Sequence, residues 1–154
     1  MENEKTVEFN TGKGILFALA GMIIGFAIWL AVIALFGIGT GGAIGGVFAA
    51  VLGMLVAGGY RKGSGKPGAV GIIIVVLLTF VAAAAAITLG VAFQIYREGM
   101  GDSVFEALEI LFDLLGTNRQ LTTAFLQDFI ISTGASVVMA IVSLVGTGKK
   151  KVKD

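Results

Sequence analysis

The chain has 154 residues, of which 56% are hydrophobic and 14% are charged, and its mean hydropathy is +0.97. Soluble globular domains carry about 25% charged residues, so this composition excludes an ordinary soluble domain and indicates a small integral membrane protein. Its 24 glycines are more than twice the usual share of about 7%.

The sequence contains neither histidine nor cysteine. It therefore lacks the usual ligands of haem, iron–sulfur clusters and zinc, and it lacks the residues of Ser-His-Asp triads and cysteine nucleophiles. We expect a protein that is not an enzyme, with no catalytic residues, no metal site and no cofactor. The formal net charge of +1 gives no general attraction to nucleic acid, so nucleic acid is not an expected partner.

Four apolar runs are long enough to cross a bilayer, which requires about 20 residues in a helix. No charged residue occurs between Lys13 and Arg61, and a glycine-rich stretch at 37–41 divides this run into two. Each pair of spans forms a helical hairpin. The predicted spans are 14–36, 42–60, 68–96 and 121–146.

The predicted fold is all-α, an integral membrane four-helix bundle of two helical hairpins with one extra amphipathic interfacial helix. A single transmembrane domain at 14–146 is flanked by a cytoplasmic segment at 1–13 and a basic cytoplasmic tail at 147–154. The lipid bilayer is the expected environment. No organelle-targeting pattern is present, which favours a bacterial plasma membrane.

The basic residues favour one orientation. Cytoplasmic ends of spans are enriched in lysine and arginine, and with both termini cytoplasmic only Arg97 and Arg119 of the 11 basic residues fall outside. The sequence therefore predicts a multi-pass protein with cytoplasmic N- and C-termini. The residues proposed as cytoplasmic anchors are Arg61, Lys62, Lys66, Lys149, Lys150 and Lys151.

Small residues recur at helical spacing within the spans, including a GxxxG pair at Gly21 and Gly25. Because lipid is as apolar as leucine, membrane helices associate through close packing, which small residues permit. The second span offers Gly42, Gly46 and Gly53 for the same purpose. These glycines either pack one bundle internally or join subunits of a homo-oligomer.

An amphipathic helix is predicted at 103–115, on the outer side. Its acidic residues recur at steps of four, three and four, so they occupy a sector of about 60°. This outer stripe is either a solvated face or a surface that attracts cations or a basic partner. Its members are Asp102, Glu106, Glu109 and Asp113.

Asp128 is the only charge in the fourth span, and Gln127 precedes it. A charge inside a bilayer is costly and points to function. Counting about 20 residues back from Lys149 reaches the outer interface near Asp128. The pair is therefore either interfacial or a candidate ion or proton site.

The glycine-rich loop at 59–67 resembles a phosphate-binding loop but departs from that pattern, because Pro67 follows Gly65-Lys66 where serine or threonine is required. A turn with basic anchors explains it, and contact with anionic headgroups or a nucleotide is the alternative.

The sequence predicts a transport-related protein, a channel or transporter component that acts as an oligomer or as an accessory subunit of a larger membrane protein. The motivation is the small-residue stripes, Asp128 and the acidic outer segment. A non-transporting structural or regulatory subunit is the alternative. A phage holin, which also ends in a basic cytoplasmic tail, is a third hypothesis.

Overall fold

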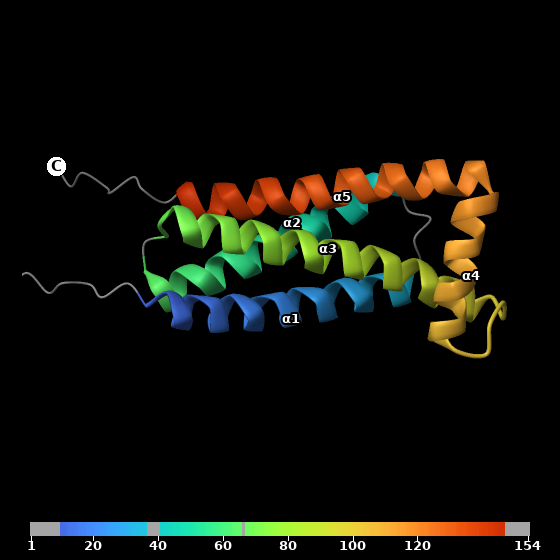
Figure 1. The fold of residues 1–154 in the computed structure, drawn as a ribbon, viewed down its shortest axis with the longest axis horizontal. Helices are drawn as coiled ribbons and strands as arrows, with labels where there is room; N and C mark the ends of the chain where they lie inside the picture. Colours follow the sequence, from blue (N-terminus) through green and yellow to red (C-terminus); the bar gives the residue numbers. More distant parts are fainter. Residues whose placement is uncertain (1–9, 37–40, 66, 147–154) are drawn as a thin grey trace, which may run out of the picture.

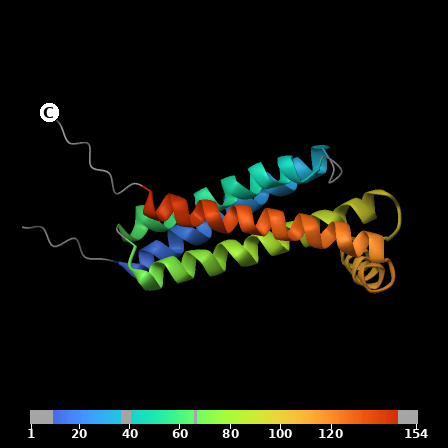
Figure 2. The ribbon, with the colours of Figure 1, turned by 90° about the horizontal axis from the view of Figure 1, so that it is seen from above.

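The computed structural model describes residues 10–36, 41–65 and 67–146. Every regular element in these ranges is a helix, which confirms the all-helical part of the prediction. Four helices lie side by side along the long axis of the molecule, and α4 lies across one end (Figures 1 and 2). The elements are α1 (Thr11–Phe36), α2 (Gly41–Ser64), α3 (Ala69–Arg97), α4 (Val104–Thr117) and α5 (Arg119–Val145).

Three of these helices are long and apolar enough to cross a membrane. The qualifying segments are Thr11–Val32, Ala69–Arg97 and Arg119–Val145, with 22, 29 and 27 residues. These three segments indicate that the chain is a membrane protein. Several helices run a few residues past the predicted apolar spans, because helical hydrogen bonding continues through polar residues once a helix has formed.

Small residues form the buried face of each long helix, and most large apolar side chains point outward. Leu16 and Ile23 on α1 are examples of the exposed class. In lipid such exposure has little cost, and close packing of small residues holds helices together. The buried small residues include Ala18, Gly21 and Gly25 on α1, Ala49, Gly53 and Ala57 on α2, Thr79, Ala83, Ala86 and Gly90 on α3, and Ser132, Ser136 and Ala140 on α5.

The backbones of α1 and α2 touch along much of their length. A Cβ atom at Gly21 would strike the carbonyl oxygen of Leu55, and one at Gly59 would strike that of Phe17. A Cβ atom at Gly63 would meet the backbone of Lys13 in the same way. Only glycine permits this approach, so α1 and α2 form a closely packed antiparallel pair.

The helix α4 packs against the end of α3. Its Ala107 and Leu111 are buried in a small apolar cluster with Ala92 and Ile95. At its start, Ser103 Oγ accepts a hydrogen bond from the Glu106 amide at 3.2 Å. This cap fixes where the helix begins, one residue after the predicted start.

Candidate functional site on the inward face of α5

Polar side chains run along one face of α5. Asp128, Ser132, Ser136 and Ser143 are spaced by four, four and seven residues, which places them within a sector of about 80°. At about 1.5 Å per residue the series extends over about 22 Å, most of the thickness of a bilayer core. Ser132 and Ser136 are buried, while Asp128 and Ser143 are half-buried. This series is called the polar face of α5 below.

The middle of the polar face is in direct contact with α2. Ser136 Oγ donates a hydrogen bond of 2.7 Å to the carbonyl oxygen of Ala49. A Cβ atom at Gly53 would strike the carbonyl oxygen of Ser136, so the two backbones touch here. At this level the polar face therefore contributes to helix packing.

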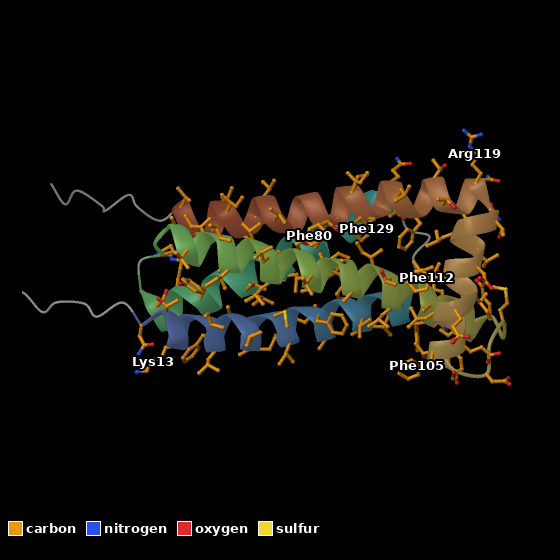
Figure 3. All side chains as sticks on the ribbon, viewed as in Figure 1. Lys13, Phe80, Phe105, Phe112, Arg119 and Phe129 are labelled. Carbon is orange, nitrogen blue, oxygen red and sulfur yellow. The ribbon has the colours of Figure 1, made fainter. Side chains whose placement is uncertain are left out.

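Two further hydroxyl groups are buried in the same region. The Oγ1 atoms of Thr79 on α3 and Thr133 on α5 have no hydrogen-bond partner in the part of the chain that the structure describes. Near Thr79, the rings of Phe80 and Phe129 meet edge to face with centroids 6.4 Å apart, which brings α3 against α5 (Figure 3). A buried hydroxyl without a partner has a free-energy cost of about 1–3 kcal/mol, so these two groups are unfavourable to the packing of the helices.

The polar face reaches the α4 end of the molecule at Asp128, in the third turn of α5. Within the described ranges the Asp128 carboxylate has no ion pair. Its neighbour Gln127 is exposed and lines an open hollow of about 530 Å³ at the start of α5. The other lining residues are Arg119, Gln120, Thr123 and Ala124. Polar groups therefore surround this end of α5.

The opposite end of the polar face is joined to α2 by a predicted anchor. Arg61 Nη1 donates a hydrogen bond of 2.9 Å to the carbonyl oxygen of Ser143. The Lys62 Nζ atom lies 6.0 Å from the centroid of the Phe17 ring. Arg61 thus holds two helices together in addition to any role at the membrane surface. The predicted anchors Lys66, Lys149, Lys150 and Lys151 lie outside the described residues.

The acidic stripe lies on the exposed side of α4, away from buried Ala107 and Leu111. One member has a local role, because Glu106 Oε2 accepts a hydrogen bond of 2.8 Å from the Asp102 amide. Among the described residues no three acidic side chains are grouped closely enough to hold a metal ion. All four members are exposed: Asp102, Glu106, Glu109 and Asp113.

The predicted packing glycines have different surroundings. Gly21 and Gly53 lie at backbone contacts, and a Cβ atom at Gly25 would come within 2.6 Å of Leu52 Cδ1. A Cβ atom at Gly46 would meet only Ile131 Cγ2, at 4.0 Å. The surroundings of Gly42 lie outside the described residues. Three of the glycines, Gly21, Gly25 and Gly53, are therefore in close contact with other helices of the same chain.

The sequence did not predict Thr79 or Thr133 as site residues. Periodicity shows that a threonine shares a face with small residues. Whether its hydroxyl finds a partner depends on the neighbouring helix. The one available signal was the excess of hydroxyl residues at 132–136 in an otherwise apolar span.

No protein-family model, curated protein or solved structure matches the chain. Residue roles therefore cannot be transferred from a relative.

Proposed function

We propose that the chain is a four-span membrane protein with a transport-related function, acting as an oligomer or as an accessory subunit of a larger membrane protein. The observation that carries this proposal is the polar face of α5, which extends from half-buried Asp128 to Ser143. Ionisable residues within membrane helices are costly, and they commonly mark ion or proton pathways. A helix that served packing alone would need no carboxylate on this face.

The path of the chain supports four spans. The end of α1 and the start of α3 lie at opposite ends of the molecule (Figure 1). If α1 and α3 both cross the membrane, α2 must return the chain between them. Its 24 residues extend about 36 Å at 1.5 Å per residue, which is enough to cross the hydrocarbon core.

The exposed aromatic residues of α4 support an interfacial position for this helix. Phe105 and Phe112 are 81% and 61% exposed. Both lie on the side of α4 that faces along the long helices (Figure 3). Aromatic side chains are favourable at membrane interfaces, while the exposed acidic stripe remains in water. The predicted amphipathic helix would then lie on the outer membrane surface.

The distribution of charge supports the orientation. Lys13, Arg61 and Lys62 lie at the end where α1 begins, and the acidic stripe lies at the other end. Under the positive-inside rule the Lys13 end faces the cytoplasm. We therefore propose cytoplasmic N- and C-termini, in the plasma membrane of a bacterium.

Close backbone contacts restrict where a solute could pass. Glycine contacts close the α1–α2 interface and the α2–α5 interface at Gly53. The rings of Phe80 and Phe129 join α3 to α5, and none of the glycine contacts found in the described residues lies between these two helices. We place the transport path at the Asp128 end of the polar face, completed by a neighbouring subunit.

Reconstitution tests the transport proposal. Liposomes containing the purified protein are assayed for proton and monovalent-cation flux with entrapped indicator dyes. We expect flux from the native protein and at least a tenfold loss in Asp128→Asn, because the amide cannot carry the charge that binds the ion. Glu98→Gln is the matched control, since it also removes a carboxylate but at an exposed position after α3. Equal flux from Asp128→Asn and native protein would exclude the proposed role of Asp128.

A non-transporting structural or regulatory subunit is the second candidate. The hydrogen bond from Ser136 to Ala49 and the contact at Gly53 favour it, because they make part of the polar face a packing element. This candidate predicts no flux from the native protein. It also predicts recovery of one partner at fixed stoichiometry, measured by native mass spectrometry from mild detergent. Cell lysis on overexpression would instead support a holin.

A further inference from the structure

The outward faces of α1 and α3 are uniformly apolar. At 16–35 on α1 and 70–81 on α3, every described residue that is exposed is an alanine or a larger apolar residue, such as Ile23 and Leu77. Lipid tails are as apolar as leucine, so a helix face of this kind is stable in contact with lipid and needs no protein partner.

The outward face of α5 has a different composition. Six of its exposed residues recur at steps of four, three, four, three and four, which is the spacing of a helix face that packs along a second helix. Arg119, about two turns before this series, points away from the other helices (Figure 3). The series, called the α5 seam below, consists of Gln127, Ile131, Gly134, Val138, Ile141 and Val145.

Gln127 is the polar member of the seam. Its side chain is exposed and makes no hydrogen bond to any described residue. Val145 ends the helix 18 residues later, which is about 27 Å at 1.5 Å per residue. A hydrocarbon core about 30 Å thick that begins at Val145 therefore includes Gln127. Lipid tails offer no hydrogen bonds, so the carboxamide is unfavourable there unless another protein group binds it.

Gly134 lies two turns further along the seam. A Cβ atom added there would meet nothing within 4 Å among the described residues, so packing within the chain does not require glycine. Glycine destabilises a helix relative to alanine, but in a membrane it lets a second helix approach closely. Gly21 and Gly53 already have such contacts inside the chain. Gly134 is open to a helix of another molecule.

We propose that a second copy of the chain packs on the α5 seam, with the two α5 helices parallel and related by a two-fold axis along the membrane normal. A carboxamide is complementary to itself, because its N–H group donates to the carbonyl oxygen of an identical group. Two copies inserted in the same orientation place Gln127 at the same depth, and the two-fold axis sets the two side chains opposite each other. A lipid tail supplies neither donor nor acceptor, so a second copy fits this face better than lipid does.

This inference rests on the proposed function only in treating α5 as a membrane span of an oligomer. Asp128 follows Gln127 directly, so the second copy would lie beside the Asp128 end of the polar face. The two copies need no transported solute in order to associate. Asp128→Asn tests transport and lies off the seam, so the transport proposal can fail while the dimer remains.

Disulfide cross-linking tests which face joins the copies, because the chain has no native cysteine. Ile131→Cys lies on the seam, and Leu77→Cys on the outward face of α3 is the matched control. Leu77 is more exposed than Ile131, at 58% against 42%. Their depths are similar, because Phe80 contacts Phe129 and the two helices run in opposite directions (Figure 1).

The full-length variants are oxidised with copper phenanthroline in phosphatidylcholine vesicles. We expect the disulfide-linked dimer of Ile131→Cys to form at least ten times faster than that of Leu77→Cys. Equal rates would show random collision and would overturn the proposed interface.

Förster transfer between separately labelled copies, at a series of protein-to-lipid ratios, measures the affinity. Gln127→Leu removes the paired carboxamides, and we expect about tenfold weaker association. Gly134→Leu adds a side chain at the point of close approach, and we expect at least the same loss. Gly58→Leu on α2 is the matched control, because Gly58 also has nothing within 4 Å of an added Cβ atom.

Weaker association in both seam variants, with Gly58→Leu unchanged, supports the dimer. Circular dichroism checks that each variant keeps its helices, since the substituted residues are exposed. A native protein that stays monomeric at every ratio would overturn the proposal, as would association unaffected by Gln127→Leu and Gly134→Leu. A loss in Gly58→Leu alone would place the contact on α2 and would also overturn it.

Discussion

The hydroxyl of Ser136 donates a hydrogen bond of 2.7 Å to the carbonyl oxygen of Ala49, although the two residues are 87 positions apart in the chain. Both residues are fully buried. One turn further along α2, the Gly53 backbone rests against Ser136. A hydrogen bond and a backbone contact together set the register between α2 and α5.

Replacement of Ser136 by alanine removes this hydrogen bond and leaves the shape almost unchanged. We expect Ser136→Ala to lower the free energy of unfolding by about 0.6 kcal/mol, the usual size of an interhelical hydrogen bond in a membrane protein. Unfolding in mixed micelles measures the change. Thr123→Ala is the control, because the Thr123 hydroxyl is exposed and bonds only to Arg119 within α5. Equal losses from both variants would show that the contact with Ala49 has no special role.

Replacement of Gly53 by alanine tests the backbone contact. The new Cβ atom would overlap the Ser136 carbonyl oxygen, so we expect α2 and α5 to separate, with a loss of about 1–3 kcal/mol. Gly58 lies on the same helix with nothing within 4 Å of an added Cβ atom. Gly58→Ala should therefore raise stability by about 0.5–1 kcal/mol, through helix propensity alone. Thermal unfolding in detergent measures the stability of each variant. Higher stability in both Gly53→Ala and Gly58→Ala would contradict the backbone contact between Gly53 and Ser136.

The start of α5 depends on a side-chain cap. Asn118 Oδ1 accepts hydrogen bonds from the amides of Gln120 and Leu121, both at 3.1 Å. We expect Asn118→Ala to lower stability by about 1 kcal/mol and Asn118→Asp to retain it, because aspartate also caps helices well. Hydrogen exchange at the first turn of α5 reports the change directly. Unaltered exchange in Asn118→Ala would rule out a capping role.

The absence of native cysteine allows the orientation to be tested cleanly. Single cysteines introduced at Lys62 and Asp113 occupy exposed positions at opposite ends of the molecule. In intact cells we expect a membrane-impermeant maleimide to label Asp113→Cys and to label Lys62→Cys only after permeabilisation. Phe105→Cys tests α4 separately, because burial in the membrane interface would slow its reaction relative to Asp113→Cys. Labelling of both ends from one side would refute the four-span proposal.

Local physical rules predicted the helices from the sequence. A charge-free run of bilayer length must satisfy its backbone hydrogen bonds internally, so a helix is its stable form in lipid. Helical periodicity also predicted which small residues share a face, such as Gly21 and Gly25. The acidic stripe followed from the same spacing.

Tertiary structure decided which faces meet and which polar groups find partners. Ser136 and Thr133 both lie in one apolar span, but only the position of α2 pairs Ser136 with Ala49, while the Thr133 hydroxyl has no partner among the described residues. Likewise, Gln127 and Gly134 remain exposed because α2 and α3 pack against other sides of α5. Local composition sets the helices and their apolar faces, whereas these contacts depend on the mutual fit of several helices that are distant in sequence.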